Sequence, residues 1–200
     1  LKKTETNNCK QVLKAGVTDM KLENYHLIGE EKIISPALIY YRDAIIENTK
    51  RTIELAGGAD RLWYHVKTHK TRELVKMQME MGFTHFMCAT ISEAEMAASV
   101  GAENVLIAYA LVGPNIDRFV ELTLGMPGTQ FWAFGDDYDT LSMLSAAAKE
   151  KGIMIPVLLD VNVGQDRTGV PLDQTADYYE KCSKLPNLQM RGLHCYDGHN

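Results

Sequence analysis

The residues that set the fold are Leu62-Trp63-Tyr64-His65-Val66-Lys67-Thr68-His69-Lys70. The first part reads as a strand over Leu62–Lys67, and a helix is predicted directly afterwards, over Thr71–Met81. Two later polar clusters, Asp160–Gly169 and His194–His199, also follow apolar, strand-like runs. All three stretches therefore fall at corresponding points of repeated strand–helix units, which favours an α/β fold.

The rest of the chain repeats this unit. Strands are predicted over Thr84–Ala89, Asn104–Ala108, Thr129–Phe134, Ile153–Val161 and Leu188–Tyr196, and helices over Ser92–Val100, from about Asn115, and over Tyr138–Lys151 and Asp173–Lys184. Successive strands begin roughly 20 to 35 residues apart, which is the rhythm of βα units whose parallel strands are covered by helices.

Two architectures have this rhythm, a doubly wound open sheet and a (β/α)8 barrel. The open sheet usually carries a Gly-x-Gly-x-x-Gly phosphate loop after its first strand, and none follows Leu62–Lys67. We therefore predict a TIM-type (β/α)8 barrel. It is incomplete, with about six βα units, because a whole barrel takes about 250 residues. We expect the natural protein to continue past Asn200.

The chain begins differently. Residues 1–34 are polar and irregular, and are predicted to be an N-terminal extension with a short helix around Lys10–Ala15. A β-prone run, Ser35–Tyr41, opens the partial barrel domain, which is predicted to cover residues 35–200. A helix is expected over Arg42–Ala56, because its apolar residues recur at helical spacing and a pair of glycines follows.

Alternate residues of a strand point to opposite faces, and this parity predicts which side chains enter the barrel. The inner face is expected to carry Trp63, His65 and Lys67 from the first strand, Leu158, Asp160 and Asn162 from the fifth, and His194 and Tyr196 from the sixth. Leu193 and Cys195 would face the helices. Because barrel active sites lie at the C-terminal ends of strands, we expect Lys67, Arg167 and Tyr196 to converge there.

These three residues suit one kind of chemistry. Partial burial and neighbouring cations favour the free amine of Lys67, which can form an imine with a carbonyl such as that of pyridoxal phosphate. The permanently charged Arg167 could bond the phenolate of that cofactor, and Tyr196 could pack on its ring and act in proton transfer. Ordinary structural roles remain open: a solvated lysine, an arginine paired with Asp160 or Asp166, and a core tyrosine.

Composition excludes other classes of function. The chain has 200 residues, is 46% hydrophobic and carries a formal net charge of -5, without the basic stripe that nucleic-acid binding requires. A small anionic ligand remains possible. No apolar run is long enough to span a membrane. The four cysteines are widely spaced and are expected to be reduced thiols: Cys9, Cys88, Cys182 and Cys195. Reduced thiols point to the cytoplasm, although a leader could have been removed before Leu1.

Several motifs, in order along the chain, resemble one family. They are Ser35–Leu38, His65–Lys70, Cys88–Thr90 with Glu93–Glu95, Ile107–Tyr109, Asp160–Gly164 with Arg167–Gly169, and Gly192–His199. Together they resemble the N-terminal half of D-threonine aldolases and eukaryotic-type D-serine dehydratases. One departure is Trp63-Tyr64, which stands where the family usually has Arg-Pro, so contacts made by that arginine are not carried over.

The resemblance implies a fold-type-III pyridoxal phosphate enzyme, with an alanine-racemase-like barrel followed by a β-rich C-terminal domain. By matching position, Lys67 would be the aldimine lysine, with His65 beside it in the cofactor site. Arg167 would bond the phenolic oxygen of the cofactor, and Tyr196 would lie against its pyridine ring. Lys67 and Tyr196 are thus the expected catalytic residues.

The activity implied is a lyase reaction on D-β-hydroxy amino acids, with retro-aldol cleavage favoured over elimination of the hydroxyl group. A divalent metal (Mn, Mg or Zn) would assist. The metal ligands and the phosphate-binding loop would lie outside this sequence, and the enzyme would be a homodimer. Two alternatives stay open. One is an amino-acid racemase of the alanine racemase type, and the other is a non-catalytic protein of pyridoxal phosphate homeostasis.

Overall fold

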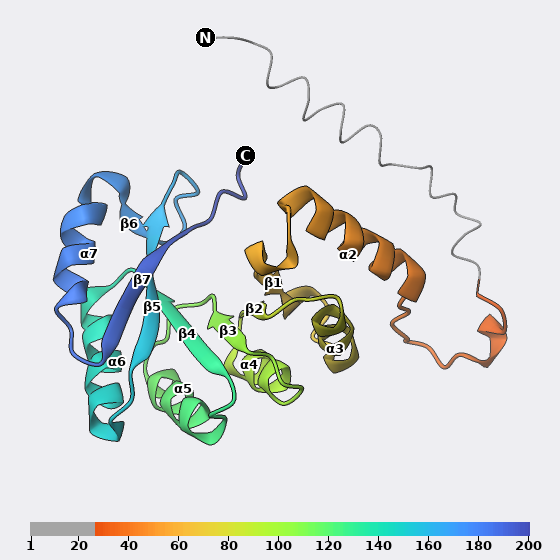
Figure 1. Cartoon of the computed structure of the whole chain (residues 1–200), viewed down its shortest axis with the longest axis horizontal. Coiled ribbons are helices and arrows are strands. Elements are labelled where there is room, and N and C mark those ends of the chain that lie inside the picture. Colours follow the sequence, from red (N-terminus) through yellow and green to blue (C-terminus); the bar gives the residue numbers. More distant parts are fainter. Residues whose placement is uncertain (1–26) are drawn as a thin grey trace, which may run out of the picture. The chain divides into compact units, whose positions relative to one another are not determined.

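The structure is a computed structural model that describes residues 27–200 (Figure 1). The short helix predicted over Lys10–Ala15 therefore lies outside the described residues, as does Cys9. The chain divides into two compact units, residues 1–48 and 49–200.

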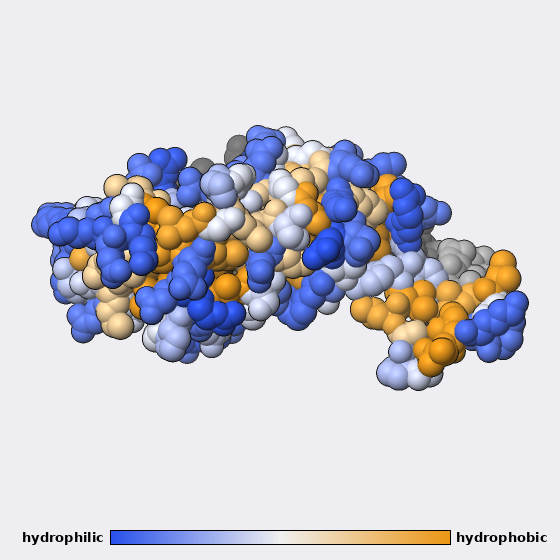
Figure 2. All heavy atoms as spheres, turned by 90° about the horizontal axis from the view of Figure 1, so that it is seen from below, coloured by the Kyte–Doolittle hydropathy of each residue, from blue (hydrophilic) through white to orange (hydrophobic). Residues whose placement is uncertain are grey.

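The described part of the first unit, residues 27–48, contains a 3-10 turn and the start of a helix. A 3-10 turn, η2 (Glu30–Lys32), follows Gly29, and helix α2 (Arg42–Ala56) begins and ends where the sequence predicts. Ser35–Tyr41 is β-prone but forms no strand, and none of the strands in the described part of the chain pairs with it. Several apolar side chains stay exposed here, among them Ile28, Ile34 and Leu38. Figure 2 shows hydrophobic residues, in orange, on the face of the molecule that it displays.

The second unit is built on a parallel sheet. Its strands are β1 (Tyr64–His65), β2 (His85–Cys88), β3 (Asn104–Ile107), β4 (Gln130–Gly135), β5 (Ile155–Asn162), β6 (Val170–Pro171) and β7 (Leu188–Cys195). They pair in the order β1-β2-β3-β4-β5-β6, and β7 also pairs with β5. Every pairing is parallel, as predicted from the alternation of strands and helices.

Helices cover one face of this sheet, as Figure 1 shows. They are α3 (Arg72–Glu80), α4 (Ile91–Ala98), α5 (Pro114–Gly125), α6 (Tyr138–Lys151) and α7 (Thr175–Ser183), with 3-10 turns η3 (Ala59–Arg61), η4 (Val66–Thr68) and η5 (Leu172–Gln174). Their ends follow local chemistry. At the start of α6, for example, the side chain of Asp137 accepts a hydrogen bond from Thr140 N–H, and Gly152 closes the helix in the left-handed conformation.

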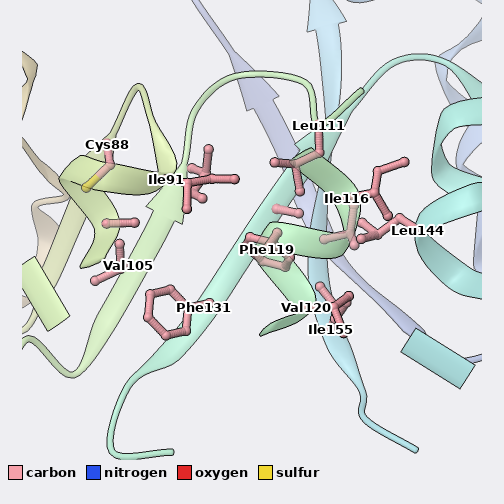
Figure 3. Close-up of a cluster of buried hydrophobic side chains, with 14 of the residues drawn as sticks. Cys88, Ile91, Val105, Leu111, Ile116, Phe119, Val120, Phe131, Leu144 and Ile155 are labelled. Carbon is pink, nitrogen blue, oxygen red and sulfur yellow. The ribbon is translucent and has the colours of Figure 1, made fainter. Parts of the chain in front are cut away.

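The hydrophobic core lies between the sheet and these helices, and Figure 3 shows part of it. Alternate strand residues such as Val105, Phe131 and Ile155 meet helix residues such as Phe119 and Leu144, and all five are at most 2% exposed. Each buried side chain of this size contributes about 1.5–3 kcal/mol to folding. Core packing therefore fixes which face of each strand remains for the inner side of the barrel.

The first strand is shorter than predicted. Only Tyr64 and His65 pair with β2, whereas the sequence suggested a strand over Leu62–Lys67. The chain turns into η4 instead, because His65 Nδ1 accepts a hydrogen bond from Lys67 N–H at 3.3 Å. The backbone turn, rather than strand parity, therefore sets the direction of Lys67.

Strand β7 holds an irregularity. Met190 pairs with Val157, yet Gly192 pairs with Leu158, so Arg191 is an extra residue of the bulge type. After it, His194 lies opposite Asp160. Both face the inner side, as the parity analysis predicted.

Within residues 27–200, no helix combines the length and apolar character that crossing a membrane requires.

Candidate active site

The first group of candidate residues surrounds the turn after β1. Lys67 lies in η4 with an exposed side chain, and Val66 next to it is completely buried. The turn is closed by two hydrogen bonds to the carbonyl of Val66, from His69 N–H at 3.2 Å and from Lys70 N–H at 2.8 Å. An amine is thus presented from a turn whose base is anchored in the core.

Two histidines flank this lysine. The pKa of His65 is lowered, mainly by burial and then by the nearby charge of Lys67. Burial also lowers the pKa of His69, whose Nδ1 accepts a hydrogen bond from Thr71 N–H at 3.0 Å. The charge of Lys67 thus acts on His65, whereas the charges that act on His69 are those of Glu93 and Lys70.

A buried carboxylate lies behind the turn. Glu93, in the first turn of α4, is 5% exposed and forms an ion pair with Lys70. Its second oxygen accepts a hydrogen bond from Ala89 N–H at 2.8 Å, just after β2. Burial raises the pKa of Glu93, but the contacts with Lys70 and Ala89 together bring it below its ordinary value.

The second group lies after β5 and β7. The guanidinium carbon of Arg167 is 4.6 Å from the centre of the Tyr196 ring, a cation–π contact. The loop that carries Arg167 is ordered by Asn162, whose Oδ1 accepts from Gly164 N–H and Asp166 N–H and whose Nδ2 donates to Asp166. Within residues 27–200, no ion pair joins Arg167 to Asp160 or Asp166, so its contact is Tyr196 rather than the acids considered from the sequence.

A buried acid–imidazole pair lies beside this second group. Asp160 Oδ1 is 2.6 Å from His194 Nδ1, and Asp160 Oδ2 accepts a hydrogen bond from Thr168 at 2.7 Å. The two side chains are 3% and 16% exposed. The His194 ring also stacks on Phe134, with centroids 4.8 Å apart. A carboxylate oxygen accepts, so Nδ1 of His194 is the donor in this hydrogen bond.

Sequence reasoning placed Asp160 and His194 on the inner face but did not pair them. Glu93 and Phe134 were not identified as site residues. The signal for the pair was their common inner face. What was missing was the register of β7 on β5, which a single strand does not reveal.

The structure thus brings Lys67 together with His65, and Arg167 together with Tyr196, both at the C-terminal ends of strands. In the described chain no hydrogen bond, ion pair or ring contact joins one pair to the other. A cavity of about 550 Å³ opens near the first group, at the ends of β2 and β3, and it is lined by residues that include Ala89, Thr90, Ser92, Tyr109 and Arg118.

The donor set suits pyridoxal phosphate. The cofactor has an aldehyde, a phenolate and an aromatic ring. Lys67 supplies an amine for the aldehyde, Arg167 a cation for the phenolate, and Tyr196 a flat surface for the ring. The backbone also makes room for the tyrosine, because a Cβ at Gly198 would collide with the Tyr196 hydroxyl. No group of three or more His, Cys, Asp or Glu side chains able to hold a metal ion occurs in the part of the chain that the structure describes.

The fold places this chain among the parallel (β/α) barrels, and comparison with known proteins identifies the family. The pattern of the alanine racemase N-terminal domain matches residues 41–200. The chain therefore belongs to the family of the alanine racemase N-terminal domain, and its fold is the incomplete barrel of that family, as predicted.

Two curated relatives act on D-hydroxy amino acids, according to their names. The 3-hydroxy-D-aspartate aldolase of Paracoccus denitrificans is 29% identical over 175 residues, which cover 86% of this chain and 45% of that protein. The D-threonine aldolase of Arthrobacter sp is 28% identical over 142 residues, covering 67% of this chain and 35% of that protein. The resemblance seen in the motifs is confirmed.

A solved structure agrees with the fold. The D-threonine aldolase from Filomicrobium marinum superposes with a TM-score of 0.76 and 31% identity, over 84% of this chain and 45% of that chain. The chain spans less than half the length of each of these three relatives.

Proposed function

We propose that this chain is the barrel portion of a pyridoxal-phosphate-dependent lyase that acts on D-β-hydroxy amino acids. The observation that carries the proposal is Lys67, an amine presented after β1 by a turn anchored on buried Val66, at the end of the sheet that also holds Arg167 against Tyr196. The family implies the cofactor, and the names of the relatives point to the substrate class.

Each residue has a definite task. Lys67 would bind the aldehyde carbon of the cofactor, Arg167 would hold its phenolic oxygen, and Tyr196 would lie flat against its ring. When bound, pyridoxal phosphate supplies an electron sink for negative charge that develops on the substrate. His65, whose pKa is lowered by burial, lies beside this lysine and accepts a hydrogen bond from Lys67 N–H, which helps to set the turn that presents the amine.

Between the two lyase reactions, we favour retro-aldol cleavage. Both curated relatives are named aldolases, and their substrates carry a hydroxyl group on the β-carbon. Elimination of that hydroxyl group, as in D-serine dehydratases, uses the same bound amine and differs in which bond breaks. The two reactions are separated by their products: an aldehyde with glycine for the aldolase, and a keto acid with ammonia for the dehydratase.

The remaining expectations belong to the same proposal. A divalent metal (Mn, Mg or Zn) would bind the substrate hydroxyl as a Lewis acid, through ligands outside these 200 residues. The enzyme would be a homodimer with a β-rich C-terminal domain, and the reduced thiols point to the cytoplasm. Cys88, Cys182 and Cys195 form no disulfide with one another.

The test is an absorbance spectrum of the full-length protein with added pyridoxal phosphate, before and after borohydride reduction, followed by peptide mapping. A visible band that is lost on reduction and maps to Lys67 is the expected result. Lys67→Ala should abolish this band, whereas Lys70→Ala should keep it. A band that survives in Lys67→Ala and disappears in Lys70→Ala would contradict the choice of lysine.

Turnover then separates the functions. Incubation with D-threonine, D-serine and 3-hydroxy-D-aspartate, followed by analysis of the products, should give an aldehyde and glycine from a β-hydroxy substrate. Interconversion of enantiomers without cleavage would point to a racemase. Cofactor binding without any turnover would point to a protein of cofactor homeostasis.

A further inference from the structure

Two lysines follow β1 only three positions apart, and both have exposed side chains. Amine chemistry requires an uncharged nitrogen at the right place, so the structure must distinguish Lys67 from Lys70. This question rests on the proposed function of Lys67. Its answer lies in Glu93, a buried carboxylate that the proposed function leaves unused.

Lys70 is held by Glu93. Its ammonium forms an ion pair with Glu93 Oε1, although the Lys70 side chain is 59% exposed and the Glu93 side chain 5% exposed. A carboxylate in direct contact favours the charged ammonium, which has no lone pair to attack a carbonyl. In the described residues, Lys67 has no such carboxylate partner, so the two amines sit in different electrostatic surroundings.

Glu93 is itself firmly placed. Its N–H donates to Thr90 Oγ1 at 3.2 Å, which caps α4, and its Oε2 accepts from Ala89 N–H at 2.8 Å. Ala89 directly follows β2, the strand that pairs with β1. The carboxylate therefore links the loop after β1 to the rigid end of the neighbouring strand.

The same contact fixes the turn that carries Lys67. The backbone of Lys70 adopts a left-handed φ of 49°, which is uncommon for a residue with a side chain, and Lys70 N–H closes the turn on Val66. The ion pair holds the far end of this turn, and buried Val66 holds the near end. Lys67 lies between the two fixed points.

We propose that Glu93 is a positioning residue that restricts amine chemistry to Lys67. It engages the Lys70 amine in an ion pair, and it fixes the turn from which Lys67 is presented. The cofactor thereby meets one reactive amine instead of two.

The test measures which lysine is labelled in the full-length protein. In the labelling step, the lysine nitrogen bonds to the aldehyde carbon of pyridoxal phosphate, the aldehyde oxygen leaves as water, and borohydride adds hydride to the carbon. Mass spectrometry of peptides then gives the label on each lysine. Wild-type protein should carry the label on Lys67. An absence of label on Lys67 in wild-type protein would count against the proposed function itself.

Glu93→Gln removes the negative charge but keeps an oxygen that can accept from Ala89 N–H. We expect the ratio of label on Lys70 to label on Lys67 to rise by about tenfold or more, because the carboxylate no longer holds the ammonium. A ratio within about twofold of wild type, in a variant with native circular dichroism, would overturn the proposal.

A second pair of variants covers the case in which Glu93→Gln fails to fold. Lys70→Met removes the tether at an exposed side chain, and the rate of labelling at Lys67 should fall by about tenfold, since the turn is no longer fixed. Lys70→Arg retains a cation for Glu93 and should restore the wild-type rate. Lys76→Met, on the exposed side of α3, is the matched control. Equal rates in Lys70→Met and Lys70→Arg would overturn the positioning role.

Discussion

Two histidines beside Lys67 are kept neutral by their surroundings. Burial is the largest cause of the lowered pKa of both His65 and His69, and nearby lysine charges add to it. Protonation of these rings is therefore linked to the stability of the folded chain. The direction of this linkage follows from the pH at which the folded and the unfolded chain each take up the proton.

The first prediction concerns pH. The unfolded chain protonates its histidines near their ordinary pKa of 6.5, whereas folded His65 resists protonation. The stability that neutral His65 contributes to the folded state is therefore complete above pH 6.5. It is lost as the pH falls from there through the lowered pKa of the folded state. His65→Asn retains an acceptor for Lys67 N–H, and it should flatten the fall in the free energy of unfolding between about pH 7 and pH 5. Urea titrations across this range provide the measurement, and an unchanged slope would contradict the prediction.

A second prediction concerns Asp160. Its side chain is 3% exposed, and its two oxygens bind His194 and Thr168. Asp160→Ala should lower the free energy of unfolding by about 1–3 kcal/mol, because it removes the hydrogen bonds that the buried carboxylate accepts from His194 and Thr168. Asp173→Ala, at an exposed acid in η5, should change it by less than about 0.5 kcal/mol. Chemical denaturation of both variants would test this, and equal effects would contradict it.

At the scale of single elements, the loop between β5 and β6 depends on a glycine. Gly169 has a φ of 102°, its N–H donates to Asp136 at 2.6 Å, and a Cβ there would collide with the backbone nitrogen of Asn162. The same loop carries Arg167. Its shape is therefore maintained by a residue without a side chain.

The third prediction follows. Gly169→Ala should destabilise the protein by about 1–3 kcal/mol and weaken pyridoxal phosphate binding, because the strained loop moves Arg167 away from Tyr196. Gly128→Ala is the matched control, since a Cβ at Gly128 meets nothing within 4 Å. Fluorescence titration with the cofactor, together with thermal unfolding, would measure both effects. A Gly169→Ala variant that binds as tightly as Gly128→Ala would refute the role of the loop.

Some elements were predictable and others were not, for physical reasons. Helices α2 and α6 have their predicted bounds, because capping and apolar spacing are local properties of the sequence. Strand β1 was predicted too long, since the hydrogen bond from Lys67 N–H to His65 Nδ1 competes with strand pairing. Lys67, Arg167 and Tyr196 do lie at strand ends. Glu93 and the pairing of Asp160 with His194 depend on contacts between distant segments, which the parity of a single strand does not reveal.

At the scale of the whole molecule, strand β7 differs from the other strands. Leu193 and Cys195 lie on its helix-facing side, as predicted, yet both are exposed, and Leu193 is 49% exposed. On β2 to β5 the corresponding residues are buried beneath helices. A barrel of the alanine racemase kind would cover them with its next helix.

The fourth prediction tests our proposal that a further helix covers this face of β7 in the full-length protein. Leu193→Asp should lower the free energy of unfolding by about 3 kcal/mol or more, because a helix then packs over this position. Met143→Asp, at a similarly exposed position on α6, should change it by about 0.5 kcal/mol at most. Differential scanning calorimetry would distinguish them. Similar melting temperatures for the two variants would contradict the expected continuation.

The bulge at Arg191 also bears on how the last strand finds its place during folding. A slip of β7 by one residue would put Leu193 or Cys195 opposite Asp160 and leave a desolvated carboxylate facing no imidazole. A shifted register is therefore disfavoured, and with the extra residue at Arg191 the strand packs Leu188 and Met190 against the core and still places His194 opposite Asp160. The acid–imidazole pair thus favours one register of β7 on β5. The register that pairs Asp160 with His194 also places Tyr196 at the end of the sheet.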